Sequence, residues 1–201
     1  MSISTLAKRV AFSFSAVATF SVVAVLIVAV LMAASPPSEH MQPKPSFTPD
    51  GQLVQPTGYR EWVYVGTPLT PNELNPPEAP FPEFHNVYIH PADFAEFKKS
   101  GKFPDGTILI KELVSVGAKQ ASSGKGYFMG DFIGLEAAVK DSRRFPDEPG
   151  YWAYFSFGHK YPLAENTSAQ PVATCNACHA ANADEDWVFV RYYPVLRAAK
   201  P

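Results

Sequence analysis

The sequence Cys-Asn-Ala-Cys-His at positions 175–179 constrains this chain more than any other feature, because it contains both of the chain's cysteines. On one helical turn the two thiols lie close together, and the next residue places its imidazole beside them. The spacing C-x-x-C-H is typical of a covalently attached c-type haem. The motif therefore predicts that Cys175 and Cys178 form thioether bonds to one haem and that His179 is the proximal iron ligand.

A structural disulfide, a thioredoxin-like redox pair and half of a zinc site are alternative interpretations of the cysteine pair. A zinc site needs about four ligands, and the sequence offers no second pair at ligand spacing. A thioredoxin-like pair follows a strand of a βαβ unit, whereas residues 165–171 before this motif have the composition of a loop. The spacing favours haem, and a disulfide stays open on the sequence alone.

Residues 1–35 are expected to direct the chain to a membrane. Lys8 and Arg9 precede an uncharged and mostly apolar run, residues 10–34, as in a signal peptide or an N-terminal anchor. The run is about long enough to span a bilayer, while the small residues 33–35 offer a cleavage zone, so both forms stay open. Because haem is attached to thiols outside the bacterial inner membrane, we expect a periplasmic protein.

Residues 36–57 are polar and rich in proline, which predicts a linker. Residues 58–201 then form one haem domain of about 140 residues with a single core. Without Lys8 and Arg9 the chain keeps 15 basic and 19 acidic side chains, a net charge of −4. This charge argues against a nucleic acid as partner.

Short strand patterns dominate the predicted domain. The segments rich in aromatic and β-branched residues are 61–65, 86–90, 107–116, 127–137, 151–157 and 187–193. A helix is expected over residues 91–100, with proline at its start and Gly101 after it, and a second short helix should carry the C-x-x-C-H motif. We therefore expect an α+β fold, mainly an antiparallel sheet with a few short helices around the haem.

The late position of the motif is unlike that in a small helical electron-transfer cytochrome c. Only 22 residues follow His179, so any sixth iron ligand must come from upstream. Met129 is the sole methionine of the domain, and its place in a strand favours core packing. His85, His90 and His159 are further candidates. We expect an open sixth position, which favours ligand binding or catalysis over simple electron relay.

Lys111 lies in an otherwise apolar strand and points to the opposite side of the sheet from Glu112. Its neighbours on its own face are Leu109 and Leu113. A lysine in such surroundings loses its charge, pairs with an anion or reacts chemically. Alternatively, its long side chain extends to the edge of the sheet.

The strand over residues 127–136 carries a carboxylate at its end. One face of this strand consists of Phe128, Gly130, Phe132, Gly134 and Glu136. Glycines between aromatic rings leave room for a flat cofactor, and apolar surroundings would raise the pKa of Glu136 toward a range useful for proton exchange. On this strand alone an equal alternative is that the glycines mark bulges and that Glu136 is solvated.

Several stretches are together similar to one known family. They are YREWVYVGTPLTPNELN, DGTILIKELVSVG, GYFMGDFIGLEAAVKDS, PGYWAYF, CNACH and VRYYPVLRAAK. In their order and spacing, from Gly51 to Lys200, the chain resembles cytochrome P-460, the hydroxylamine-oxidising c-type cytochrome of ammonia and methane oxidisers.

The resemblance implies a third covalent link to the haem, from Lys111 to a meso carbon, beside the thioethers of Cys175 and Cys178. It also implies that His179 is the proximal ligand and that Glu136 is the distal carboxylate that takes protons from the substrate. Hydroxylamine is then oxidised to nitric oxide or nitrous oxide, electrons pass to a soluble cytochrome c, and the protein is a homodimer.

The chain departs from this family in its long apolar N-terminus, its proline-rich linker, and His85 where an arginine is expected. The related β-sheet cytochromes c-prime share the fold, lack the cross-link and bind nitric oxide behind an aromatic cap, for which Phe128 or Phe132 is a candidate here. The alternative function is therefore a nitric-oxide-binding or detoxifying cytochrome. The combination of Lys111 with Glu136 favours the enzyme.

Overall fold

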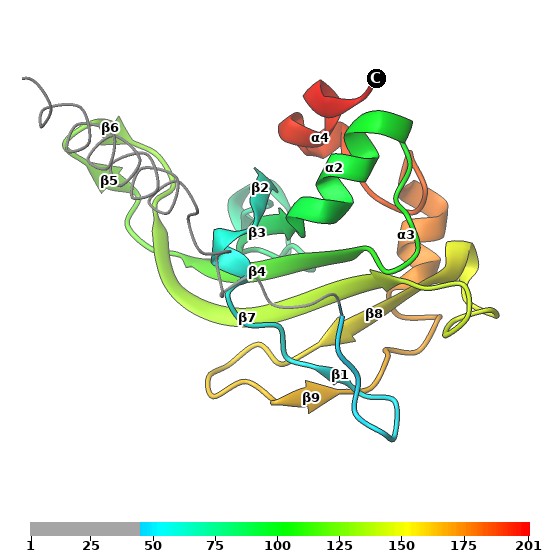
Figure 1. Ribbon diagram of the computed structural model, residues 1–201. Coiled ribbons are helices and arrows are strands. Elements are labelled where there is room, and N and C mark those ends of the chain that lie inside the picture. The colour runs from blue at the N-terminus through cyan, green and yellow to red at the C-terminus, as the bar shows by residue number, and fades with distance from the viewer. Residues whose placement is uncertain (1–44) are drawn as a thin grey trace, which may run out of the picture. The chain divides into compact units, whose positions relative to one another are not determined.

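The computed structural model describes residues 45–201, and its centre is a five-stranded antiparallel sheet. Its strands are β2 (Val63–Gly66), β3 (Phe84–Ile89), β4 (Ile108–Val116), β7 (Met129–Lys140) and β8 (Trp152–Ser156), which lie side by side in that order (Figure 1). The antiparallel sheet with short helices confirms the α+β fold. The predicted signal or anchor segment, residues 1–35, and residues 36–44 of the predicted linker lie outside the described residues. The rest of that segment is not a free linker, because Leu53 is fully buried in the core.

Short elements complete the described part of the chain. The α-helices of residues 45–201 are α2 (Pro91–Ser100), α3 (Asn176–Asn182) and α4 (Pro194–Ala199), and the two-residue strands are β1 (Leu53–Val54), β5 (Gln120–Ala121), β6 (Gly124–Lys125) and β9 (Asn166–Thr167). Three-residue 3₁₀ helices cover Tyr59–Glu61, Asn72–Leu74 and Pro149–Tyr151. Strand β1 pairs with β9, and β5 pairs with β6 in a small hairpin between β4 and β7. None of the helices in residues 45–201 has the length and apolar character needed to cross a membrane.

The sheet separates two groups of buried side chains, because neighbouring residues of a strand point to opposite faces. On β4, Ile108 and Ile110 belong to a cluster that includes Leu53 of β1. Leu109 belongs to the other cluster, with Phe97 of α2 and Leu196 of α4. Helices α2 and α4 therefore cover one face of the sheet, and β1 and β9 lie on the other (Figure 1).

The helix predicted over residues 91–100 is confirmed as α2. Its first turn begins with Pro91, and the ring of His90 accepts a hydrogen bond from the Ala92 amide. Gly101 ends the helix with a φ of 69°, and its amide donates to the carbonyl of Phe97. Glycine tolerates this left-handed conformation, which explains the sharp end of the helix.

The strand predicted over residues 187–193 is wrong. This segment contains only the isolated bridge between Glu185 and Val188 and then a 3₁₀ helix, Val190–Tyr192. Left-handed backbone at Asp186 and Trp187 turns the chain away from the sheet. The β-branched residues pack into the core on the helix face instead of pairing with a strand. Their composition signalled burial, which sequence alone does not distinguish from strand formation.

Candidate functional site

The C-x-x-C-H motif lies on a helix, as predicted. Cys175 is the residue before α3, and the buried side chain of Asn176 donates a hydrogen bond of 2.7 Å to the carbonyl of Trp152, which fixes the helix to β8. Both thiols are free, with Cys175 half-buried and Cys178 exposed. The structure therefore does not support the disulfide alternative and leaves both sulfur atoms available for thioether bonds.

The ring of His179 is held on one side and free on the other. Its Nδ1 lies 2.8 Å from the carbonyl oxygen of Trp187 and donates to it, and its Nε2 makes no hydrogen bond within residues 45–201. The rings of Tyr154 and Phe189 pack against it, with centroids 4.3 and 4.7 Å away. Burial lowers the pKa of His179, so the ring is neutral at pH 7. A neutral imidazole with a free Nε2 is the form that ligates a metal.

Lys111 and Glu136 occupy directly opposed positions on β4 and β7. The Lys111 Nζ lies 2.5 Å from Glu136 Oε2, and the two side chains are 25% and 20% exposed. The ring of Phe81 lies 4.4 Å from the same Nζ. Of the outcomes expected for a lysine in this strand, the structure shows pairing with an anion.

The pKa of Glu136 is lowered, which differs from the sequence expectation. Burial raises the pKa of this carboxyl, but the charge and hydrogen bond of Lys111, together with His159, outweigh burial and hold the pKa below its usual range. The sequence showed the apolar surroundings and not the cation on the neighbouring strand. If Lys111 loses its charge, His159 alone opposes the effect of burial, and the pKa of Glu136 rises.

His159 is a second partner of Glu136, considered from the sequence only as an iron ligand. Its Nε2 lies 2.9 Å from Glu136 Oε1, and its side chain is 50% exposed. The loop after β8 brings it there because Gly134 has no side chain: a Cβ at Gly134 would lie 2.8 Å from the carbonyl oxygen of Gly158. Gly134 therefore permits a close approach of the backbone at Gly158. This contact explains the glycine at position 134 better than the expectation that it leaves room for a flat cofactor.

His85 brings an unpaired polar atom to the same region. It lies opposite Leu113 in the pairing of β3 with β4, so it shares the face of Lys111. Its Nε2 is buried without a hydrogen-bond partner. Burial, followed by the charge of Lys111, lowers its pKa to about 4. His85 is therefore a neutral imidazole whose Nε2 is free to bind a further group.

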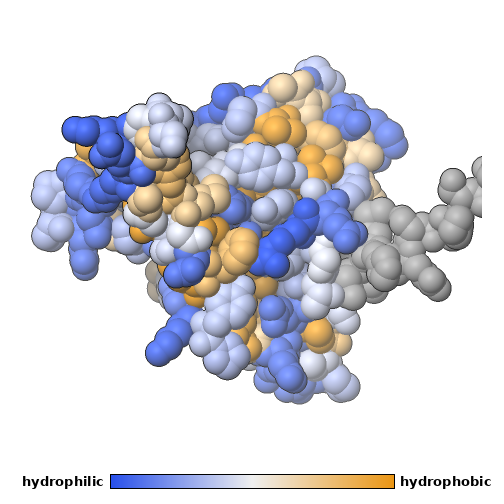
Figure 2. All heavy atoms as spheres, turned by 90° about the vertical axis from the view of Figure 1, so that its left-hand side faces the viewer, coloured by the Kyte–Doolittle hydropathy of each residue, from blue (hydrophilic) through white to orange (hydrophobic). Residues whose placement is uncertain are grey.

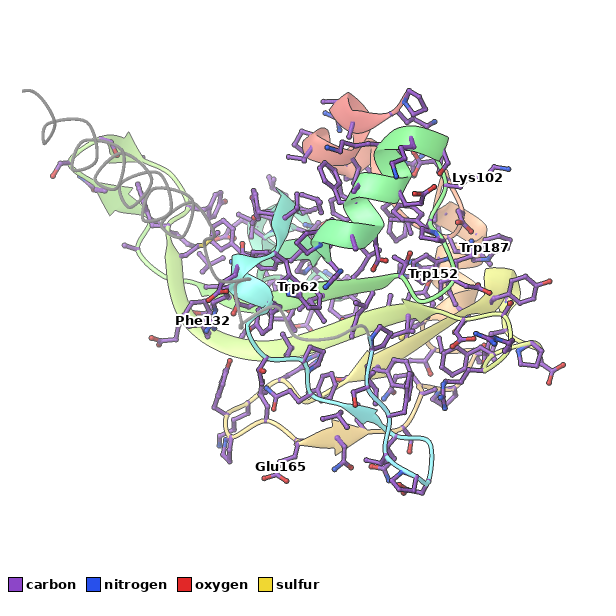
Figure 3. The ribbon with its side chains drawn as sticks, viewed as in Figure 1. Trp62, Lys102, Phe132, Trp152, Glu165 and Trp187 are labelled. Atoms are coloured by element: carbon purple, nitrogen blue, oxygen red, sulfur yellow. The ribbon has the colours of Figure 1, made fainter. Side chains whose placement is uncertain are left out.

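A β-bulge separates Phe132 from this site. The register of β4 and β7 shifts between Leu113 and Val114, so that Phe132 lies opposite Val114 on the face of Glu112. There the guanidinium of Arg60 lies 4.2 Å from the centre of the Phe132 ring. Phe132 is exposed, and Figure 3 shows it on the left-hand side of the view. Figure 2, which faces that side of the molecule, shows apolar groups among polar ones. The expectation that Phe132 shares a face with Glu136, and could cap a haem there, is wrong.

The C-x-x-C-H helix and the Lys111–Glu136 pair lie on the same face of the sheet. On β7 and β8, Glu136 pairs with Ser156, and two residues further along Ala138 pairs with Tyr154, the residue whose ring packs on His179. Lys111 lowers and Glu136 raises the pKa of His179, each by its charge. Two free thiols, an imidazole with a free Nε2, an amine and a carboxylate are thus gathered at one place, and this set of groups fits a covalently held haem.

The comparison with known families agrees with this geometry. The family model for cytochrome P460 matches residues 56–190, more than half of the chain. The matched region contains every predicted site residue: Lys111, Glu136, Cys175, Cys178 and His179. No curated protein matches the chain.

Proposed function

The chain belongs to the cytochrome P460 family, and we propose that it is a periplasmic c-type cytochrome that oxidises hydroxylamine. Family membership makes it a haem-binding cytochrome. The observation that carries the finer proposal is the Lys111–Glu136 pair, an amine and a carboxylate 2.5 Å apart on the face that also carries the C-x-x-C-H helix. The alternative, a cytochrome that only binds nitric oxide, does not use the amine for a link to the haem.

The residues that would hold one haem c are the two thiols, the imidazole and the amine. Cys175 and Cys178 would form the thioethers, His179 would ligate the iron through Nε2, and Lys111 would add a third covalent link through Nζ. When bound, the haem supplies a redox centre that accepts electrons from a small substrate and passes them on. The N–C link would replace an N–H bond of Lys111 and a C–H bond of the haem, with loss of two protons and two electrons to an external oxidant, and it would remove the cation beside Glu136.

Glu136 is the proposed general base. Hydroxylamine loses three protons and three electrons when it forms nitric oxide; two molecules lose four of each when they form nitrous oxide and water. Once Lys111 has lost its charge, burial raises the pKa of Glu136 against a weaker opposing effect, which makes the carboxylate a stronger base. His159 contacts Glu136 Oε1 and is half-exposed, so protons collected by Glu136 have a short path to water.

The released electrons require an acceptor outside the chain. We propose a soluble cytochrome c for this role, and a homodimer as the assembled form, both on the resemblance to the family. The periplasmic location rests on the apolar segment within residues 1–35, with or without cleavage, and on the covalent attachment of haem to thiols.

Steady-state kinetics of the purified holoprotein test the proposal. Hydroxylamine should reduce a soluble one-electron acceptor with turnover, and the absorption of the reduced protein should show a strongly red-shifted Soret band. An ordinary c-type spectrum together with nitric oxide binding and no turnover would contradict the proposal and support the nitric-oxide-binding alternative.

A further inference from the structure

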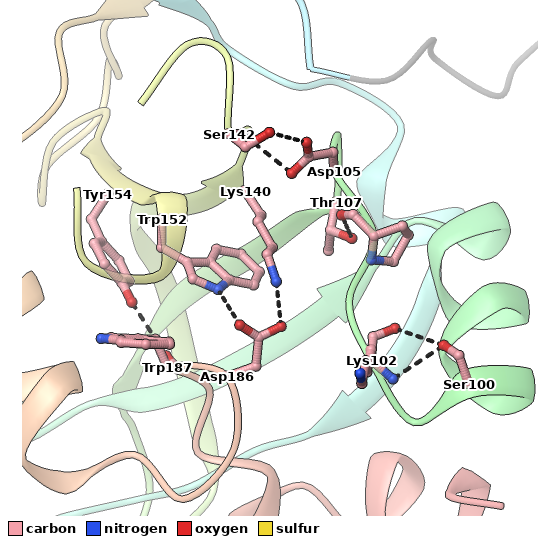
Figure 4. A network of polar contacts seen from close by, with 11 residues as sticks. Ser100, Lys102, Asp105, Thr107, Lys140, Ser142, Trp152, Tyr154, Asp186 and Trp187 are labelled. Atoms are coloured by element: carbon pink, nitrogen blue, oxygen red, sulfur yellow. Dashed lines mark hydrogen bonds and ion pairs between the residues drawn. The ribbon is translucent and has the colours of Figure 1, made fainter. Parts of the chain in front are cut away.

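The carbonyl oxygen of Trp187 accepts two hydrogen bonds. One comes from Nδ1 of His179 at 2.8 Å, and the other from the hydroxyl of Tyr154 at 3.2 Å. Figure 4 shows Tyr154 pointing from β8 toward this carbonyl. The rings of Tyr154 and His179 also pack against each other. The phenol and the imidazole are therefore in contact and donate to the same carbonyl oxygen.

The segment that carries this carbonyl has an uncommon backbone. Asp186 and Trp187 are consecutive non-glycine residues with left-handed φ values of 46° and 58°, a conformation that persists only where the surroundings hold it. The ring of Trp187 packs against Gly150, where any Cβ would collide with it. In Figure 3, Trp187 lies beside Trp152 at the end of the sheet near α3.

The side chain of Asp186 fixes this segment to the sheet. Nζ of Lys140 donates to Asp186 Oδ2 at 2.6 Å, and the indole of Trp152 donates to Oδ1 at 3.4 Å. Both bonds are visible in Figure 4. The Lys140 and Asp186 side chains are only 15% and 23% exposed, so this ion pair is less screened by solvent than a surface pair. The backbone segment that carries the Trp187 carbonyl is thus held at the ends of β7 and β8.

We infer that Tyr154 and the Lys140–Asp186 pair are positioning residues that set how strongly His179 donates to the haem iron, because they hold and share the one carbonyl that binds its Nδ1–H. The inference rests on His179 as the proximal ligand of this family, and it does not depend on hydroxylamine as the substrate.

The physical reason is the coupling between the two nitrogens of imidazole. A stronger hydrogen bond from Nδ1 makes Nε2 a better electron donor to a metal. The Tyr154 hydroxyl competes for the same oxygen and weakens that bond, whereas the Lys140–Asp186 pair keeps the oxygen in reach of the ring. The two features therefore act in opposite directions on the same bond, which a purely structural role would not produce.

Resonance Raman spectra of the ferrous holoprotein report the iron–histidine stretch directly. Tyr154→Phe should shift this band to higher frequency and lower the midpoint potential, because the carbonyl then serves His179 alone. Lys140→Gln should shift the band to lower frequency, and Lys140→Arg should restore it. Tyr193→Phe removes a hydroxyl from the same core cluster, and Lys200→Gln removes the neighbouring ion pair with Glu185; neither control should move the band.

The possible results distinguish a failure of the positioning role from a failure of His179 as the iron ligand. A band unmoved in both Tyr154→Phe and Lys140→Gln, or shifted in the same direction by both, would overturn the inference. A holoprotein without any iron–histidine band would remove His179 as the ligand and the inference with it. Haem content and circular dichroism show whether Tyr154→Phe folds. If it does not, the comparison of Lys140→Gln with Lys140→Arg still tests the positioning role.

Discussion

Lys111 and Glu136 face each other across β4 and β7 with Nζ and Oε2 2.5 Å apart, and both side chains are mostly buried. This contact couples the charge states of the two groups. In the proposed link to a haem, the amine would lose its charge. If the amine is consumed in this way, the carboxyl loses the cation that lowers its pKa and becomes a stronger base.

Replacing Lys111 by alanine should leave haem attached and abolish the red-shifted Soret band together with hydroxylamine oxidation. The thioethers depend on Cys175 and Cys178, whereas the altered spectrum depends on the proposed third link. Absorption spectra and haem content of the purified variant measure both effects. Lys125→Ala, at an exposed lysine of β6, is the control and should keep colour and activity. An unchanged spectrum in Lys111→Ala would refute the link.

Glu136→Gln should keep the colour and slow hydroxylamine oxidation by about 10²-fold or more, the usual contribution of a general base. Glutamine retains the size of the side chain but accepts no proton at neutral pH. The rate of acceptor reduction measures the effect, with the exposed Glu165→Gln as control. Full activity in Glu136→Gln would leave Glu136 without a catalytic role.

His159→Ala should slow turnover less than Glu136→Gln does, by about 10-fold, because water can partly replace a half-exposed proton carrier. The diagnostic measurement is the solvent deuterium isotope effect on turnover, which should increase in His159→Ala because proton transfer from Glu136 to water becomes slower. A variant at full rate, or one whose isotope effect is unchanged, contradicts the proposed proton path.

The stability of the holoprotein should fall as the pH drops from about 6.5 toward 4, in part because of His85. Burial lowers the pKa of His85 to about 4 from an ordinary value of 6.5. Between these values the unfolded chain binds more protons than the folded one, so stability rises with pH across this window. In His85→Gln, which cannot titrate, denaturant unfolding should show a flatter pH dependence. An equally steep dependence would contradict a neutral, buried His85.

Arg60→Met should destabilise the fold by about 2 kcal/mol, less than the loss of a fully buried pair because Arg60 is half-exposed. It leaves Glu112, which is 1% exposed, with the hydroxyl of Tyr59 as its one remaining side-chain partner among residues 45–201. Adding Glu112→Leu should recover much of the loss, since the unpaired charge is then gone. Denaturant unfolding measures these changes. A loss as small as that of Arg143→Met, at an exposed arginine, would contradict a stabilising role for Arg60.

The elements that the sequence predicted best are those with local signals. Helix α2 carries its own start and stop residues, and the core strands β3, β4, β7 and β8 have aromatic and β-branched runs bounded by turns. Residues 187–193 have the same composition and form no strand, because the left-handed turn at Asp186 and Trp187 is fixed by Lys140, a residue far away in sequence.

The site was predicted as a set of residue types and not as a set of contacts. The motif and the strand pattern pointed to Lys111, Glu136 and His179. The bulge that moves Phe132 to the other face, and the loop that brings His159 to Glu136, depend on register and on close backbone approach. Nor could residue types reveal the carbonyl of Trp187 as an acceptor, since every residue has a carbonyl.

Proteolytic peptide mapping by mass spectrometry shows whether Lys111 is joined to the haem. Digestion of the purified holoprotein should release one haem species joined both to the peptide with Cys175 and Cys178 and to the peptide with Lys111. Recovery of the haem on the cysteine peptide alone, with the Lys111 peptide unmodified, would refute the third link and the enzymatic function proposed from it.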